Sequence, residues 1–345
     1  MFSFASNSII SKAKSIYGKS IKPSDYESLL KMKSVPEVAQ YLSNHVNYRD
    51  TLQDVQVDSI HRARLEELIK KNIFNHTIRL IKFIRVRDYK FYEINLLKRE
   101  LDILLEIVRS IISDDYDNQI AETPNYMKKH ATFDIFEASK STSMSELLDI
   151  VKDTDYLKIL SKYSNVSNKD IDYVSIERDL EIYYFDEIFR RIDQNYKGKL
   201  KKDLDNIYLT KIELGNITKI YRLKKFYNAD FSMIKTALIH KYSRISEKKI
   251  DELISLPNPD LILNYLRDSE YNNYIDKSEY VYVEYYSDRI KYNLAKRFMY
   301  FSSSVPKVYA AFLLLCDIEV QNLINIIEGI RYQLSEAEIR KMLIY

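Results

Sequence analysis

The stretch Ser24–Leu52, S-D-Y-E-S-L-L-K-M-K-S-V-P-E-V-A-Q-Y-L-S-N-H-V-N-Y-R-D-T-L, predicts two short helices and decides how the rest of the chain is interpreted. Ser24 with Glu27, and Ser34 with Glu37, both fit the pattern Ser-x-x-Glu. In this pattern the hydroxyl and the carboxylate accept hydrogen bonds from the N–H groups that are unpaired at a helix start. The stretch therefore predicts a pair of capped helices.

The same pattern recurs twice farther along the chain. Ser143 with Glu146 begins the second stretch, and Ser246 begins the third, in which Asn258 and Pro259 introduce the second helix. Two sets of markers keep a spacing of 109 to 116 residues: Tyr41, Tyr156 and Tyr265, and Asn95, Asn206 and Asn322. Solenoid repeats are only about 20–50 residues long. This spacing instead predicts three similar helical modules, at 1–115, 116–230 and 231–345.

The composition favours an all-α fold. The chain has 345 residues, of which 4 are glycine and 6 are proline. So few turn-forming residues leave little room for β-hairpins. With 46% hydrophobic and 30% charged residues, the chain is also typical of a folded, soluble protein.

Apolar residues at spacings of three and four predict several long helices. The clearest runs from Tyr92 to Ile112, and its polar side carries an i,i+4 pair, Lys98 with Asp102. Gly215 indicates a close crossing of two helices. Residues 113–129 are the best candidate for a linker. The other long helices are expected at 1–22, 57–86, 176–192, 203–227, 279–301 and 320–334.

Several classes of function find no support in the sequence. None of the glycines forms a phosphate-binding loop, and the histidines do not fall in a metal-binding spacing. The single cysteine, Cys316, excludes an intrachain disulfide. The longest apolar run, Val308–Cys316, is shorter than the roughly 20 residues of a transmembrane helix. We expect a soluble, cytoplasmic protein with no catalytic, cofactor or metal residues.

The charges are nearly balanced. There are 53 basic and 50 acidic residues, a net charge of +3, which is not typical of a dedicated nucleic-acid binder. The basic residues form three clusters, at 79–87, 197–202 and 222–225. Such clusters are either solvated helix faces or docking surfaces for an acidic partner, since clustered charge steers association.

Six motifs follow one another along the chain: F-A-S-N-S-I-I-S-K-A-K-S (4–15), D-Y-E-S-L-L (25–30), F-Y-E-I-N-L-L-K (91–98), D-L-D-N-I-Y-L (203–209), R-L-K-K-F-Y (222–227) and D-I-E-V-Q-N-L-I-N-I-I-E-G-I-R (317–331). In their order and spacing they resemble the C subunit of archaeal and bacterial A/V-type ATPases, the counterpart of eukaryotic subunit d. The resemblance covers essentially the whole chain. In the first motif Ala13 matches the family, whereas Ser11 and Lys12 depart from its basic-aliphatic pattern.

This resemblance implies three similar helical bundles in a funnel with pseudo-threefold symmetry. It also implies a non-enzymatic rotor subunit that joins the central stalk to the membrane proteolipid ring, transmits torque and is peripheral to the membrane. The expected partners are central-stalk subunits and the proteolipid ring, with no nucleic acid and no small-molecule substrate. Within this framework we expect Arg85, Arg87, Arg222 and Lys224 to contribute to the contacts with stalk or ring.

Other classes of protein stay open at this point. A stand-alone helical scaffold or adaptor would have nearly the same sequence features, and co-purification with ATPase subunits would distinguish the two. A nucleic-acid binder is less favoured, and its binding would weaken steeply with salt. A helical enzyme is least favoured, because no nucleophile and base are arranged in a recognisable pattern.

Overall fold

The computed structural model describes residues 2–83, 89–115, 123–275 and 279–345, and no strand occurs among them. The prediction of an all-α fold is therefore confirmed for the described part of the chain. The first half contains α1 (Phe2–Gly18), α2 (Pro23–Leu29), α3 (Val35–Asn44), α4 (Arg49–Leu52), α5 (Arg62–Phe83), α6 (Tyr89–Tyr92), α7 (Ile94–Ser113), α9 (Ile135–Ser139), α10 (Met144–Ile150) and α11 (Tyr156–Leu160). The second half contains α12 (Tyr173–Asn195), α13 (Gly198–Tyr227), α14 (Phe231–Ala237), α15 (Glu247–Ser255), α16 (Ile262–Asp268), α17 (Val283–Phe301), α18 (Val305–Arg331) and α19 (Glu336–Arg340).

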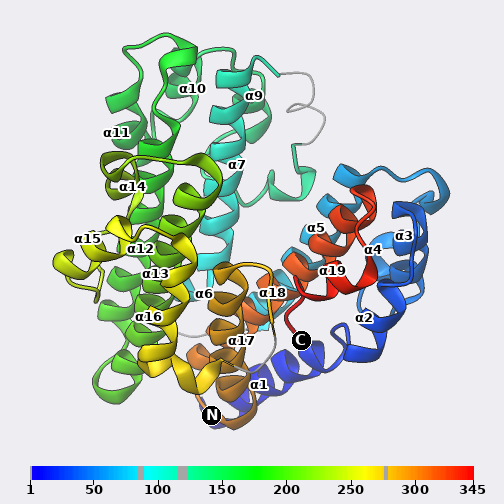
Figure 1. Cartoon of the computed structure of the whole chain (residues 1–345). Helices are drawn as coiled ribbons and strands as arrows, with labels where there is room; N and C mark the ends of the chain where they lie inside the picture. The colour runs from blue at the N-terminus through cyan, green and yellow to red at the C-terminus, as the bar shows by residue number, and fades with distance from the viewer. Residues whose placement is uncertain (1, 84–88, 116–122, 276–278) are drawn as a thin grey trace.

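The helices form two arms that meet at α18 (Figure 1). One arm contains α2 to α5 together with α19, so it is built from both ends of the chain. The other arm contains α7 and α9 to α16, the middle of the chain. Helix α18 packs against α17, α1, α5 and α13, which belong to both parts of the molecule. It is therefore the element that joins the arms.

The buried apolar residues follow this division. One cluster contains Leu29, Leu42 and Leu65 from the N-terminal helices with Leu323 and Ile339 from the C-terminal ones. A second cluster is formed by the end of α13 with α14 to α17. The largest cluster is formed by α1, α5 to α7, α9 to α12, the start of α13, α17 and the first half of α18. The division into modules at 1–115, 116–230 and 231–345 stays a prediction.

Each of three long helices buries one glutamate that accepts hydrogen bonds from a tyrosine. On α18, Glu319 accepts from the Tyr48 hydroxyl at 2.6 Å and from the backbone N–H of Ile21 at 3.0 Å. On α7, Glu100 accepts from the backbone N–H of Thr132 at 3.2 Å and also from the Tyr156 hydroxyl. The same kind of contact thus recurs in separate parts of the chain.

The third buried carboxylate is Glu213 on α13. It accepts from the Tyr271 hydroxyl at 3.0 Å, from the Tyr265 hydroxyl at 3.4 Å and from the Arg244 guanidinium at 2.7 Å. Tyr156 and Tyr265 are two of the markers found in the sequence. In the first stretch this position is taken by Tyr48, because the hydroxyl of Tyr41 donates to Asp25 instead.

Two asparagines follow these glutamates by three residues and pair with backbone groups. Asn322 binds both the N–H and the carbonyl of Ile344, at 2.9 and 2.7 Å. Asn216 binds the N–H and the carbonyl of Ile239 in the same way, at 3.0 and 2.9 Å. Asn216, and not the sequence marker Asn206, therefore makes the contacts that Asn322 makes.

The caps predicted from the sequence are confirmed with one exception. Ser34 and Ser143 each accept a hydrogen bond from the N–H three residues later, at 3.3 Å. The predicted box of Ser24 with Glu27 is wrong, because α2 already begins at Pro23. The backbone N–H of Lys22, the residue before α2, instead donates to the carboxylate of Asp25 at 2.7 Å.

The glycine predicted to mark a helix crossing is also a different one. A Cβ placed on Gly215 would meet no atom within 4 Å, so no close crossing exists there. A Cβ placed on Gly329 would lie only 2.5 Å from the Cγ1 atom of Ile339. Gly329 is therefore the residue whose missing side chain lets two helices, α18 and α19, approach.

Several helix boundaries differ from the expected ones. The final long helix begins at Val305 instead of residue 320, so it includes the apolar run Val308–Cys316. This makes α18 long and apolar enough to cross a membrane, but 72% of its most apolar window is buried inside the protein. The helix expected at 57–86 begins at Arg62, after a short 3-10 turn at Val57–Ser59.

Candidate partner-binding cleft

A cleft of about 480 Å³ lies between the arms at the place where α18 joins them. Its floor is the exposed side of α18, and its walls are parts of α5, α7 and α12. The lining residues are Lys70, Ile73, Phe74, Asn95, Lys98, Arg99, Asp102, Leu105, Glu106, Arg109, Tyr173, Glu177, Asp317, Val320, Gln321 and Ile324. We define the cleft by these residues.

Asp317 is the charged residue in the floor of the cleft. It is exposed although its neighbours on α18, Cys316 and Ile318, are buried. Protein surrounds the carboxyl on the concave face, and this desolvation raises its pKa above the ordinary value, while the amines of Lys211 and Lys98 partly offset the rise. The floor thus presents one acidic group that is open to a partner.

The wall formed by α7 carries charges that are already paired. Lys98 forms the expected i,i+4 ion pair with Asp102. The guanidinium of Arg99 lies 3.5 Å from Glu106 and donates to the hydroxyl of Tyr126 at 3.2 Å. Such pairing fixes the directions of the side chains, so the wall has a defined pattern of charge before any partner arrives.

The wall formed by α7 also carries an arginine that is held on an aromatic ring of α12. The guanidinium of Arg109 donates to the hydroxyl of Tyr173 at 2.7 Å and lies 5.2 Å from the centre of that ring. This contact links α7 to the start of α12. It leaves the remaining guanidinium N–H groups able to bind a carboxylate of a partner.

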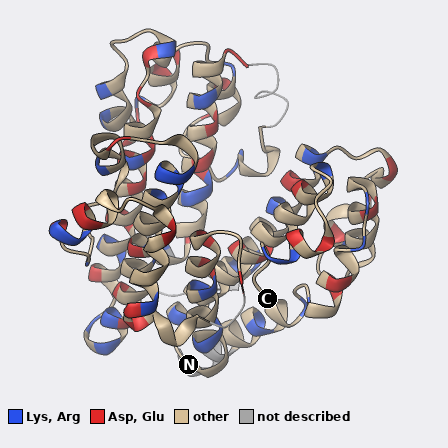
Figure 2. Ribbon diagram, in the orientation of Figure 1, with Lys and Arg blue, Asp and Glu red and all other residues tan. Residues whose placement is uncertain are grey.

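The chemistry of the cleft suits recognition of a protein better than catalysis. Basic and acidic side chains alternate along its walls, and no cluster of metal-binding residues occurs in the part of the chain that the structure describes. Figure 2 shows Lys, Arg, Asp and Glu interspersed over both arms, without the single-sign stripe that a nucleic acid requires. A protein segment with charges of both signs would match this surface.

Of the residues predicted to contact partners, Arg222 and Lys224 are described by the structure, and neither lines the cleft. Arg85 and Arg87 lie outside the described residues. Arg222 is exposed on α13; burial raises the pKa of Glu284, and the charge of Arg222 partly offsets that rise. Lys224 donates its amine to the backbone carbonyl of Ile254, and it therefore stabilises the C-terminal end of α15.

The part of α18 around Asp317 is not predicted as part of a cleft. In the sequence Asp317 stands out only as the first residue of the motif at 317–331, whereas in the structure it is an exposed carboxylate between the buried residues Cys316 and Ile318. That signal was present in the sequence, because Val308–Cys316 and Ile318 flank it with apolar residues. Arg109 and Tyr173 are 64 residues apart, and nothing in the sequence indicates that they meet.

Comparison with known proteins places the chain in one family. A family model described as ATP synthase (C/AC39) subunit matches residues 9–342. The match thus covers nearly the entire chain, including both arms and α18. No curated protein matches the chain.

Proposed function

The chain belongs to the ATP synthase (C/AC39) subunit family, and from that premise we propose that it is a non-catalytic rotor subunit of a V-type ATPase. In this role it joins the central stalk to the membrane proteolipid ring and transmits torque between ATP hydrolysis or synthesis and ion transport. It is peripheral to the membrane and is held there by its partners.

The observation that carries this proposal is the cleft between the arms. A part that transmits torque must grip its partner without rotating relative to it. The cleft offers a concave surface with charges of both signs, fixed by contacts such as Arg109 with Tyr173. Fixed charges of this kind set the register of a partner more than they add affinity.

The packing of α18 supports a stiff body. This helix is buried over most of its length and contacts α1, α5, α13 and α17. Close-packed interiors transmit strain because their side chains have little room to move. A force applied in the cleft would therefore reach both arms.

The predicted funnel of three similar bundles belongs to the same proposal. The recurrence of a buried glutamate with a tyrosine partner, at Glu100, Glu213 and Glu319, supports three related modules. Their spacing of 113 and 106 residues is close to that of the markers in the sequence.

The contact residues predicted from the sequence remain part of the proposal, but they differ in how well they are placed to contact a partner. Arg222 is exposed at the end of α13 and is suited to contact the stalk or ring. Arg85 and Arg87 are proposed contacts from their sequence alone. Lys224 is a weaker candidate, since its amine already binds the carbonyl of Ile254.

The test is reconstitution of the chain with stalk and ring subunits, followed by co-purification. We expect the chain to bind both, and Asp317→Lys to weaken stalk binding because it reverses the charge of the cleft floor. Asp58→Lys is the matched control, as Asp58 is exposed and does not line the cleft. Binding to neither subunit would refute the proposal and favour the stand-alone scaffold or adaptor.

A further inference from the structure

A second cavity, of about 310 Å³, lies between α13, α17 and α18 and is separate from the walls of the cleft. Its lining is apolar on one side, with Leu294, Phe298 and Leu314. On the opposite side it carries Lys211 and Asn206 from α13. Ligand-binding pockets combine an apolar lining with a few converging polar groups in this way.

Most of the charged groups around this cavity are already neutralised. The amine of Lys307 lies 2.7 Å from the carboxylate of Asp203. Arg244 is paired with Glu213, which lies behind it on α13. The amine of Lys291 forms an ion pair with Asp288, and the carboxylate of Glu270, which also lines the cavity, lies near the Arg244 guanidinium and raises the pKa of that group.

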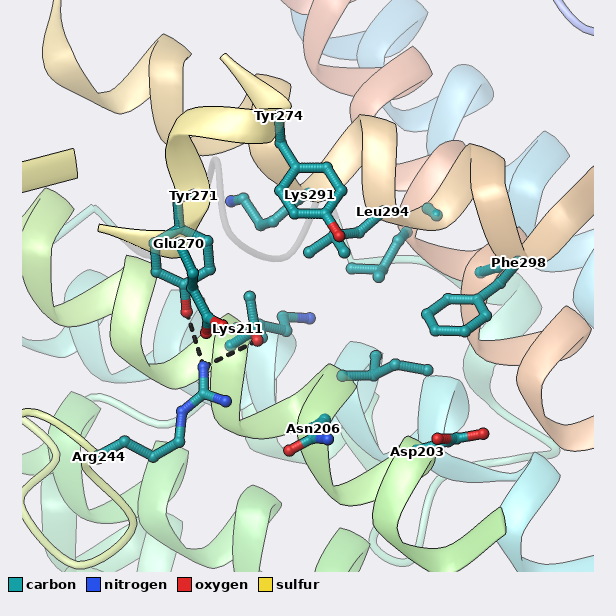
Figure 3. A pocket seen from close by; sticks show the side chains of 15 residues that line it. Asp203, Asn206, Lys211, Arg244, Glu270, Tyr271, Tyr274, Lys291, Leu294 and Phe298 are labelled. Carbon is teal, nitrogen blue, oxygen red and sulfur yellow. Dashed lines mark hydrogen bonds between the residues drawn. The ribbon is translucent and has the colours of Figure 1, made fainter. Parts of the chain in front are cut away.

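Lys211 is different. Its amine makes no hydrogen bond and no ion pair with any residue that the structure describes, and its nearest defined contact is the Tyr184 ring, 5.8 Å from the ring centre. Figure 3 shows this amine pointing into the open space between Tyr274 and Phe298. A half-buried cation without a partner is costly, and the cost is removed when an anion binds to it.

We propose that this cavity binds a small amphipathic monocarboxylate, whose carboxylate pairs with the Lys211 amine and whose apolar part packs against Leu294, Phe298 and Leu314. The hydroxyl of Tyr274 and the side chain of Asn206 line the same cavity, on opposite sides of the Lys211 amine (Figure 3). The ligand would be bound and not transformed.

The size of the cavity limits the ligand. If each non-hydrogen atom occupies about the 30 Å³ that one water molecule takes in the liquid, the space holds about ten such atoms. Octanoate, an eight-carbon carboxylate, has that size. It is therefore the probe to use.

The state of Lys211 agrees with an anionic ligand. Burial lowers the pKa of this amine, and the charge of Lys98 lowers it further. The carboxylates of Asp317, Asp102 and Glu181 act in the opposite direction without overcoming burial. A carboxylate bound directly to the amine would restore its charged form.

The experiment is calorimetric titration of the purified full chain with octanoate, and with octanol as the neutral probe of equal length. We expect octanoate to bind more tightly than octanol. Replacement Lys211→Met removes the amine but keeps the bulk, and it should weaken octanoate binding by about ten- to a hundredfold, since hydrogen bonds to charged groups contribute that much.

Two further variants make the result specific. Lys291→Met removes a lysine from the same cavity whose charge Asp288 already balances, so octanoate binding should change by less than about threefold. Leu294→Trp fills the cavity while leaving Lys211 in place, and it should abolish binding. Equal binding of octanoate and octanol, unchanged binding in Lys211→Met, or no binding of octanoate to the unaltered chain would overturn the inference. None of these measurements involves the ATPase partners.

Discussion

Removal of one hydroxyl tests how the N-terminal arm is attached to α18. In Tyr48→Phe the ring stays in place, but Glu319 loses the donor that lies 2.6 Å from its carboxylate. Tyr48 is fully buried and Glu319 is 7% exposed, so water cannot replace the lost donor. The carboxylate would keep only the N–H of Ile21 and the amide of Asn47, at 3.0 and 3.3 Å.

The magnitude follows from these contacts. A hydrogen bond to a charged group contributes about 1.5–3 kcal/mol to folding, and we expect Tyr48→Phe to lower the free energy of unfolding by that amount. The melting temperature should fall by about 2–4 °C. Urea unfolding followed by circular dichroism, together with a thermal scan, measures both quantities.

Tyr41→Phe is the control for this experiment. Its hydroxyl also donates to a carboxylate, that of Asp25 at 2.8 Å, but this pair is only partly buried. Water can replace the donor there, so the loss should be about 0.5–1 kcal/mol. If both variants lose the same stability, the buried Glu319 contact does not anchor the arm and the reasoning is refuted.

Three further predictions concern packing, capping and pH. In Gly329→Ala the new Cβ would collide with Ile339, so the melting temperature should drop by an amount equivalent to about 1–3 kcal/mol, and Ile339→Ala should cost less stability in the Gly329→Ala chain than in the unaltered chain. Asp25→Ala should lower the free energy of unfolding in urea by about 1 kcal/mol and Ser24→Ala by much less, because the Asp25 carboxylate accepts a hydrogen bond from the Lys22 N–H at the start of α2. Equal losses in the two variants would contradict this assignment. Burial raises the pKa of the Glu319 carboxyl above its ordinary value of 4.5. Between the pKa of the unfolded chain and the higher pKa of the folded protein, the folded state therefore binds more protons than the unfolded state. The free energy of unfolding consequently falls as pH rises through that window. Glu319→Gln should flatten this fall in melting temperature measured between about pH 4 and 8, and an unchanged slope would count against it.

The sequence predicted the helices well because their signals are local. The apolar seam between Tyr92 and Ile112 needs only its own residues to specify α7, and Ser34 reaches an N–H only three residues away. The extent of α18 was predicted poorly for the same reason. Its first half is apolar on every side, so it lacks the spacing that identifies a helix with one buried face.

The candidate cleft could not be predicted from the sequence. It requires α5, α7, α12 and α18 to meet, and their contacts join residues that are far apart in the chain. Arg109 reaches Tyr173, and Asp317 faces the wall that carries Lys98. A basic cluster is visible in a sequence, whereas a concave surface with alternating charges is a property of the assembled fold.

The N-terminal arm is closed by the last residues of the chain. Tyr345 stacks on Tyr26 with ring centres 4.6 Å apart, and Arg340 pairs with Glu27. During synthesis, α2 can therefore be enclosed only after residues 340–345 have been made, while the middle of the chain has its neighbours earlier. Loss of residues 340–345 would consequently expose the side of α2 that carries Tyr26.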